Sequence, residues 1–338
     1  MTTIGIDSHK RSHTAVAMDA AEQPLDRLRI PASADQVAAL LAWAARWPQR
    51  RWAVEGAWGT GRLLAQQLVA AGQTVIDVPA TLAARVRLLD TGKARKNDDI
   101  DSAATAVAGL RRGDLHDVTA EGFPQVMRLL VDRRDQLTAQ RTRTVNRLHR
   151  HLGDLIPGGA VRKLSAARAA ALLDTHTPAT QVELERKLIA VDLLDDVARL
   201  DGQIKGNGRR IREVVTASGT TLTQLFGVGH ITAAILIAHT GDPARFCGQG
   251  AYASYNGSAP VEASSGDMRR HRLNRGGDRQ LNRALHIMAI TQIRHATAGR
   301  VYCQRKLEER KTDKEALRAL KRQLSNVVYR RFLDDHQN

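Results

Sequence analysis

Four acidic residues carry the chemistry that this sequence suggests first. Asp7 closes an apolar stretch near the N-terminus, Glu55 lies inside the apolar stretch RWAVEGA, and Asp98 and Asp101 stand three positions apart in ARKNDDIDSAAT. Residues three apart on a helix share one face. Carboxylates brought together repel one another unless cations lie between them. The pattern therefore suggests a metal site.

Mg²⁺ is the cation that suits such a site. It takes oxygen ligands, usually keeps several waters, and also binds substrate phosphates. Two ions can clamp the attacking and leaving oxygens of a phosphodiester. We therefore expect Mg²⁺, with two ions per active site.

Each acid also has an ordinary structural role open to it. Asp7 would accept backbone hydrogen bonds from the turn that follows it, and Glu55 would be a charge on an edge strand. Asp98 or Asp99 would cap the helix that begins there, the commonest role for Asp at that position. The order of the acids, one on each of two strands and a D-x-x-D at the head of a helix, favours the metal site. Asp99, which points about 100° away from its neighbours, is then a solvated acid of the first turn.

The N-terminal part, residues 1–125, must position these acids. Residues 2–31 alternate as strands do, with the polar stretch 8–13 as a hairpin connection. Strand and helix patterns then follow each other: helices over 34–47 and 59–71, strands over 51–57 and 74–79, and helical sequence to about 110. A meander followed by alternating helices and strands predicts a mixed α/β sheet layered by helices.

From about residue 125 the pattern is helical. A long, basic, amphipathic helix or coiled coil is predicted over 132–155, with further helices over 160–173, 181–205 and 301–333. The stretch KGNGRR, 205–210, is expected to break the helix before it. Residues 221–241 resemble a helix-hairpin-helix, whose Gly-x-Gly turn would meet a phosphate. The remainder divides into a helical or coiled-coil linker, 126–215, and a C-terminal domain, 216–338.

The basic charge of the chain lies mostly outside the N-terminal part. The formal net charge is +16, yet residues 1–120 hold 15 Lys and Arg against 13 Asp and Glu, and the rest of the chain holds 36 against 22. Clustered cations gain affinity for phosphates by releasing counterions. We therefore expect a nucleic-acid partner, and the 4% aromatic content argues against a base-stacking single-strand platform.

Composition excludes several classes of protein. The N-terminus has no basic region followed by an apolar one, and the longest dense apolar run, 233–238, is too short to cross a bilayer. Cys247 and Cys303 are too far apart for a paired-ligand motif or a disulfide framework. We expect a cytoplasmic protein without a membrane segment.

Three blocks of the N-terminal part resemble a known family. IGIDSHKRSHTAVAMD, VEGAWGTGRLLAQQL and KARKNDDIDSAA resemble, in that order, blocks of the DEDD transposases of bacterial insertion elements, whose RuvC-like domain has an RNase H fold. The family's third block has the form K-x-D-x-x-D-A. The resemblance therefore selects Asp98 and Asp101 as ligands beside Asp7 and Glu55, and Ser102 stands where the family more often has Ala.

A second block, YASYNGSAPVEASSGDMRRHRLNRGGDRQLNRAL over 252–285, resembles the C-terminal transposase domain of the same elements. The G-x-x-P and Ser-Gly pattern places the family's serine nucleophile on Ser265, with Ser264 as the neighbour that a shifted alignment would select. Without the resemblance, EASSGD would be taken for an ordinary turn.

The resemblance implies a reaction. A serine oxygen displaces a deoxyribose oxygen from a DNA phosphate and forms a covalent phosphoserine, which stores the bond for rejoining. Metal ions would lower the pKa of the serine, and arginines would stabilise charge on the phosphorus. The candidates for nucleic-acid contact are Arg269, Arg270, Arg272, Arg275, Arg279 and Arg283.

The fold and partners follow from the same resemblance. It implies an α/β plus α protein: an RNase H-like (RuvC-like) N-terminal domain, a long helical or coiled-coil middle, and a mostly helical C-terminal transposase domain. The partners would be DNA (the element ends and the target), a noncoding bridge RNA that guides the reaction, and further copies of the chain. A homodimer or tetramer would have composite active sites, and the protein would lie at the nucleoid when it acts.

Three alternatives stay open. A RuvC-like structure-selective nuclease would use the four acids and water, and its activity would survive loss of Ser265. An actin-like ATPase would need a second phosphate loop, which we do not find in the sequence. A non-catalytic DNA-binding protein would tolerate loss of the acids.

Two histidines also lie close to the first acid. His9 and His13, four apart, fall in the predicted hairpin turn, where that spacing does not converge with Asp7 on one metal.

Overall fold

The computed structural model describes residues 1–338 except 92–96, 160–163, 263–270, 273 and 338. The chain forms two compact units, Met1–Glu121 and Gly122–Asn338. Each unit has its own hydrophobic core.

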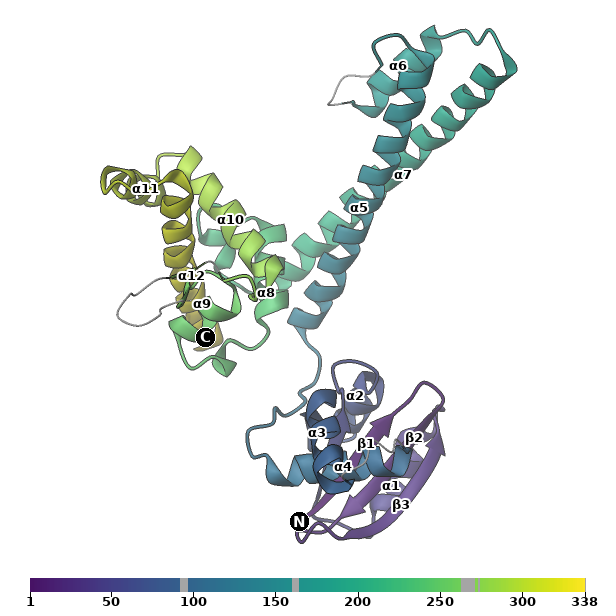
Figure 1. The fold of residues 1–338 in the computed structure, drawn as a ribbon, viewed down its shortest axis with the longest axis vertical. Helices are drawn as coiled ribbons and strands as arrows, with labels where there is room; N and C mark the ends of the chain where they lie inside the picture. Colours follow the sequence, from purple (N-terminus) through teal and green to yellow (C-terminus); the bar gives the residue numbers. More distant parts are fainter. Residues whose placement is uncertain (92–96, 160–163, 263–270, 273, 338) are drawn as a thin grey trace. The chain divides into compact units, whose positions relative to one another are not determined.

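The first unit is built on a five-stranded sheet (Figure 1). Its strand order is β3-β2-β1-β4-β5, where β2 runs antiparallel to both neighbours and β1, β4 and β5 run parallel. The strands are β1 (Thr2–Ser8), β2 (Ser12–Met18), β3 (Pro24–Pro31), β4 (Arg50–Glu55) and β5 (Val75–Val78). This order and polarity define an RNase H-like sheet, so the predicted fold class is confirmed.

Helices cover both faces of this sheet. The side chains of Ile4 and Trp52 pack with α1 (Gln36–Ala44) and α2 (Arg62–Ala70) in one core. The opposite face carries α4 (Asp98–Arg111), which packs on β1 and β2, with α3 (Ala80–Thr91) beside it. Because strand side chains alternate between faces, the residues of β1 on either side of Ile6 point to α4.

Gly5 sets how closely α4 approaches β1. A Cβ atom at this position would lie 2.1 Å from the Ser102 carbonyl oxygen and 2.4 Å from the Ala106 nitrogen. Ser102 is fully buried at the same contact, and its hydroxyl lies within hydrogen-bond distance of the carbonyl oxygens of Thr14 (2.9 Å) and Asp98 (2.7 Å), either of which can accept its one proton. Serine therefore fits where the family more often has alanine.

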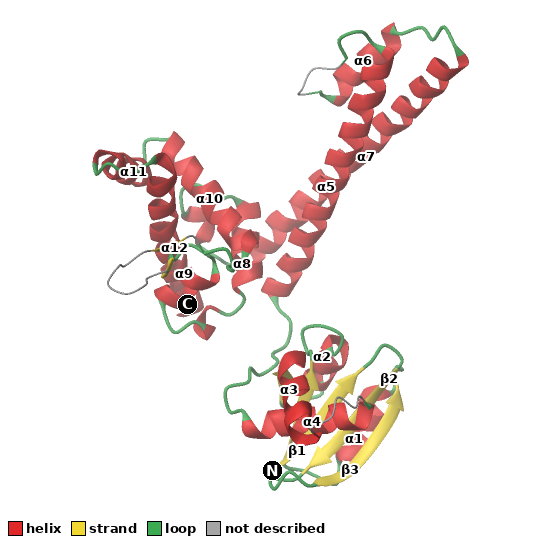
Figure 2. Cartoon of the chain, in the orientation of Figure 1, coloured by secondary structure: helices red, strands yellow, loops and turns green. Residues whose placement is uncertain are grey.

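The second unit begins with two long antiparallel helices, α5 (Phe123–Leu155) and α7 (Gln181–Ala217), which lie side by side (Figure 2). The short α6 (Ala166–Thr175) packs at their far end. The expected break at KGNGRR is wrong, because α7 continues through Gly206 and Gly208. Between them Asn207 is buried and donates to the Leu130 carbonyl oxygen at 3.1 Å, so packing on α5 outweighs the cost of about 1 kcal/mol per glycine.

The remainder of the second unit is mostly helical. It contains α8 (His230–Thr240), α9 (Gln249–Tyr255), a two-stranded sheet of β6 (Val261–Glu262) and β7 (His271–Arg272), α10 (Arg279–Arg294), α11 (Ala298–Glu308) and α12 (Asp313–Gln337). Leu236, Leu285 and Leu324 share its core.

Two predictions for this part are wrong in detail. The helix expected before the Gly-x-Gly turn is only a 3₁₀ turn, η1 (Leu222–Gln224), so the segment is not a helix-hairpin-helix. Gly227 in that turn has φ 89° and packs closely against Met288. The positive φ and this close contact explain why a glycine occupies the position. The single helix expected over 301–333 is divided into α11 and α12 at Arg310, which has φ 60°.

None of the helices in the described residues combines the length and the apolar character that crossing a lipid bilayer requires.

We predict that Gly5→Ala destabilises the first unit by about 3 kcal/mol, because α4 must move away from β1 to admit the methyl group. Urea unfolding followed by circular dichroism measures the change. Gly113→Ala is the matched control, since a Cβ there meets no atom within 4 Å. Equal stability of the two variants would contradict the close approach of α4 to β1.

Candidate metal centre

Asp7 and Glu55 end neighbouring parallel strands on the face that α4 covers. The register pairs Ile6 of β1 with Val54 of β4, and each acid follows by one residue. The hydroxyl of Thr105 on α4 lies 3.5 Å from Glu55 Oε2 and also donates to the Asp101 carbonyl oxygen at 2.8 Å. Glu55 therefore faces α4 one turn after Asp101.

The first turn of α4 presents the other two acids. Asn97 is the N-cap, and its side chain accepts from the Asp99 backbone nitrogen at 3.4 Å, so neither Asp98 nor Asp99 caps the helix. Asp101 is 5% exposed. The Asp99 carboxylate forms an exposed ion pair with Arg27 at 2.9 Å, away from the other acids.

His9 brings Asp7 and Asp98 into one group. Its Nε2 lies 3.0 Å from Asp7 Oδ2 and 3.6 Å from Asp98 Oδ1. Among the described residues, these three side chains form a group whose ligand atoms all lie within 4.8 Å of one another. Glu55 and Asp101 lie beside this group and not in it.

The four-residue spacing predicted that neither His9 nor His13 would join Asp7 in a metal site. That prediction holds for His13 and is wrong for His9, whose side chain lies beside Asp7. The His9 backbone nitrogen donates to the Ser12 carbonyl oxygen at 3.0 Å, so the residue opens the hairpin at the end of β1, where its side chain reaches Asp7. His13 belongs to β2 and faces the other side of the sheet, where its ring bonds Gln36 of α1 at 3.0 Å.

The electrostatics of Asp7 indicate a cation. Burial raises the pKa of Asp7, and the carboxylates of Asp101 and Asp98 raise it further, while His9 opposes them. Asp7 Oδ2 is buried, and the nearest polar atom among the described residues is His9 Nε2 at 3.0 Å, in a geometry that does not satisfy the oxygen fully. A buried, unsatisfied carboxylate oxygen is costly, and a divalent cation would compensate it.

The donor set fits a divalent cation. Carboxylate oxygens suit Mg²⁺ and Mn²⁺, and an imidazole nitrogen is a better ligand for Mn²⁺ than for Mg²⁺. Asp7, His9 and Asp98 would hold one ion, with Glu55 and Asp101 beside it. Arg29 of β3 also reaches Asp98 Oδ2, at 3.4 Å.

Arg87 of α3 forms an ion pair with Asp101. Both side chains are largely buried, at 19% and 7% exposure, so the guanidinium neutralises this carboxylate strongly. Asp101 can bind a metal ion only if Arg87 moves or shares the carboxylate. Sequence reasoning missed Arg87 because the contact joins two helices across the connection that contains residues 92–96.

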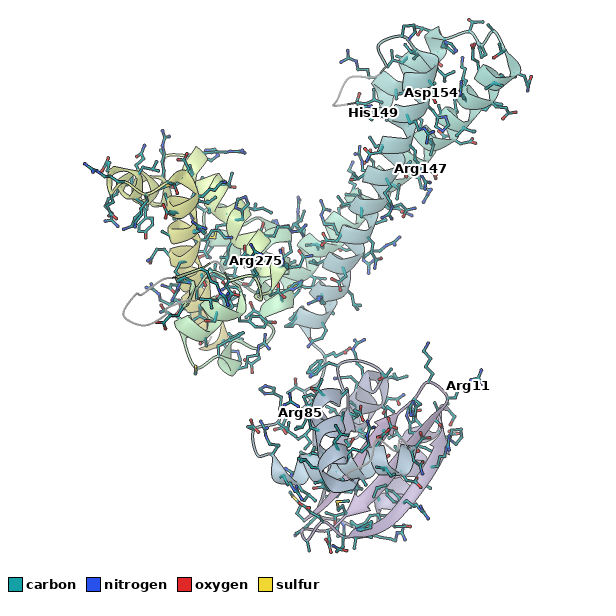
Figure 3. The ribbon with its side chains drawn as sticks, viewed as in Figure 1. Arg11, Arg85, Arg147, His149, Asp154 and Arg275 are labelled. Carbon is teal, nitrogen blue, oxygen red and sulfur yellow. The ribbon has the colours of Figure 1, made fainter. Side chains whose placement is uncertain are left out.

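Part of the predicted serine site lies outside the described residues: Ser264, Ser265, Arg269 and Arg270. Of the other arginines, Arg272, Arg275 and Arg279 are exposed, and Figure 3 shows Arg275 in the loop before α10. Arg283 instead forms an ion pair with Asp135 of α5 at 3.1 Å.

Two family models match separate parts of the chain. The model of the IS110-type DEDD transposases, described as a transposase, matches residues 4–157. A second model, described as the transposase IS116/IS110/IS902 family, matches residues 219–304.

Relatives match along nearly the whole chain. An insertion element IS116 protein of Streptomyces clavuligerus is 28% identical, covering 98% of this chain and 94% of the relative. An insertion element IS900 protein of Mycobacterium paratuberculosis is 26% identical, covering 98% and 95%. A solved structure, Thermus thermophilus RuvC in complex with a Holliday junction substrate, is 18% identical over 35% of this chain and 99% of that chain, with a TM-score of 0.28.

We predict that Mn²⁺ raises the melting temperature of the protein and that Asp7→Asn abolishes the increase. An ion at 100 times its dissociation constant stabilises the folded state by about 2.7 kcal/mol, and Asp7 is more buried than His9 and Asp98, which share the ion with it. Differential scanning calorimetry, with and without Mn²⁺, measures the shift. Asp99→Asn is the control and keeps the increase, because Asp99 forms its ion pair with Arg27 at the surface. An undiminished shift in Asp7→Asn contradicts the assignment.

Proposed function

The chain belongs to the family of IS110-type DEDD transposases, and from that premise we propose that it is the Mg²⁺-dependent recombinase of an insertion element, which cuts and rejoins DNA through Ser265. The observation that carries the proposal is the meeting of Asp7, His9 and Asp98 at the C-terminal end of the central strand of an RNase H-like sheet, with Glu55 and Asp101 beside them.

The acidic residues act on the phosphate. Asp7, Glu55 and Asp98 would hold the divalent ions with His9 as a further ligand, and Asp101 would join them once Arg87 moves or shares its carboxylate. When bound, the ions activate the attacking oxygen and neutralise charge on the leaving one. The buried setting of Asp7 keeps bulk water away from its side of the centre, which strengthens every charge interaction there.

Ser265 would exchange the phosphodiester bond that is cut for a covalent bond between the serine oxygen and phosphorus, which can be used for rejoining. Its oxygen forms a bond to phosphorus while the phosphorus–deoxyribose oxygen bond breaks, and the serine proton ends on the released hydroxyl. Attack by the hydroxyl of another DNA end reverses the step and frees the serine. The family match over residues 219–304 includes this position and supports the assignment.

A guide RNA fits the charge of the second unit. Arg133, Arg143, Arg147 and Arg150 are exposed along α5, and none pairs with an acid within the described ranges. Figure 3 shows Arg147 and His149 on this helix. Proteins hold guide duplexes by backbone and shape, while base pairing selects the target.

Oligomerisation with composite active sites fits an apolar strip on α7. Leu184, Leu188 and Val191 are spaced i, i+4 and i+7, and they are 39%, 50% and 39% exposed. Such a strip on a long helix is typical of a coiled-coil partner. A second copy of the chain is the partner that the family resemblance implies.

A second candidate function is hydrolysis of branched DNA with water as the nucleophile. It is favoured by the acids and the sheet lying together in one compact unit, Met1–Glu121. This nuclease would not need the second unit for chemistry.

We predict that Ser265→Ala lowers recombination between donor and target plasmids by roughly 10³-fold or more and removes the covalent protein–DNA species, because the nucleophile is lost. Denaturing gel electrophoresis with labelled DNA detects the covalent species. Ser264→Ala is the matched control and retains it. Full cleavage by Ser265→Ala would refute the recombinase and favour the water-using nuclease.

We predict that the triple variant Arg143→Gln, Arg147→Gln, Arg150→Gln binds the noncoding RNA that flanks the gene more weakly. The slope of log Kd against log salt concentration should fall by roughly 1 for each phosphate that an arginine no longer neutralises. Fluorescence anisotropy across a salt series measures both quantities. Arg11→Gln, Arg85→Gln, Arg112→Gln removes the same charge from the first unit and serves as the control. Equal effects of the two triple variants would argue against RNA binding on α5.

A further inference from the structure

A cavity of about 370 Å³ lies in the second unit between the turn 257–260 and α12. We call it the α12 cavity. Arg272 and Asn274 line it near the turn, and Arg318, Lys321 and Arg322 line it from α12. α12 lies beyond residues 219–304, so the family match does not assign this surface.

The α12 cavity concentrates positive charge. Positions 318, 321 and 322 are spaced i, i+3 and i+4, so the three cations share one face of the helix. Within the described residues, no close ion pair joins a carboxylate to any of them or to Arg272, and Glu315, one turn before Arg318 on α12, attracts Arg318 only at longer range. Lys321 donates to Asn282 and Arg322 donates to Asn326, and both acceptors are neutral amides.

This charge is costly without an anion. Lys321 is partly buried, and burial lowers the pKa of its ammonium group. A desolvated cation without a counter-charge destabilises the folded protein. Ser258 also lines the cavity, and its hydroxyl oxygen is buried without a hydrogen-bond partner among the described residues. A group with several anionic oxygens would satisfy the cations and this hydroxyl together.

We propose that the α12 cavity binds backbone phosphates of the DNA strand that Ser265 attacks. The inference rests on the proposed function. Pro260 and Arg272 line the cavity, and the chain between them carries Ser265, three positions after β6 ends at Glu262. The cations of the cavity exceed the charge of one phosphodiester, so they suit successive phosphates of a strand. Arg318, Lys321 and Arg322 are therefore positioning residues for the DNA.

The test compares two double variants that remove equal charge from the same unit. Arg318→Gln/Arg322→Gln changes the cavity, and Arg300→Gln/Arg330→Gln changes exposed positions on α11 and α12 outside it. Fluorescence anisotropy with an element-end DNA duplex, over a salt series, gives affinity and salt slope. We expect the cavity variant to lose roughly tenfold more affinity than the control and to lower the slope by about 1 to 2.

Three outcomes overturn the proposal: equal losses in the two double variants, a loss confined to an RNA duplex of the same length, and a slope that does not change. Failure of the proposed function would appear in a different experiment, because Ser265→Ala would then still cleave DNA. The DNA affinities of the two double variants are measured independently of that result.

Lys321→Met separates a binding role from a structural one. A phosphate-binding role predicts weaker DNA binding with a melting temperature that is unchanged or higher, since an uncompensated charge is removed. Weaker binding with a lower melting temperature would assign Lys321 to structure alone and overturn its part in the site.

Discussion

The candidate metal centre depends on the contact between α4 and the backbone of β1. Gly5 leaves no side chain between the two elements, so α4 approaches until Ser102 and Ala106 touch the strand. This close contact places the acids of the first turn of α4 next to the ends of the strands that carry Asp7 and Glu55. Burial at this contact raises the pKa of Asp7, and the neighbouring carboxylates of Asp101 and Asp98 raise it further, so part of the packing energy of this unit offsets desolvation and charge repulsion.

The arginine and lysine side chains have different partners in the two units. In the first unit the arginines lie against the acids: Arg27 on Asp99, Arg29 on Asp98 and Arg87 on Asp101. Such pairs lower the repulsion while the centre holds no ion. In the second unit, Lys321 and Arg322 of the α12 cavity donate to neutral amides, and no close ion pair among the described residues includes them. An excess of positive charge that the chain does not neutralise itself is what a polyanion partner requires.

The sequence predicted those parts of the site that regular periodicity determines. Strand alternation predicted the positions of Asp7 and Glu55, helical spacing predicted those of Asp98 and Asp101, and the fold class is confirmed, while the role of the four acids as ligands stays a prediction. His9 was missed because its side-chain direction is set by a hairpin turn, and no period describes a turn. Arg87 was missed because its contact joins two helices. The helix break expected at Gly206 and Gly208 is absent for the same reason: the packing of α7 on α5 outweighs the low helix propensity of glycine.

His9 has a consequence for how selective the centre is. A site of carboxylates alone would offer the oxygen donors that suit Mg²⁺. The abundance of each divalent ion would then largely determine which one binds. An imidazole that lies 3.0 Å from Asp7 and 3.6 Å from Asp98 adds a nitrogen donor, which strengthens Mn²⁺ more than Mg²⁺. The same ring opposes the rise in the pKa of Asp7, and so helps to keep that carboxylate ionised when no metal is bound. One residue at the end of β1 thus affects both which ion the site prefers and whether the site is ready to receive it.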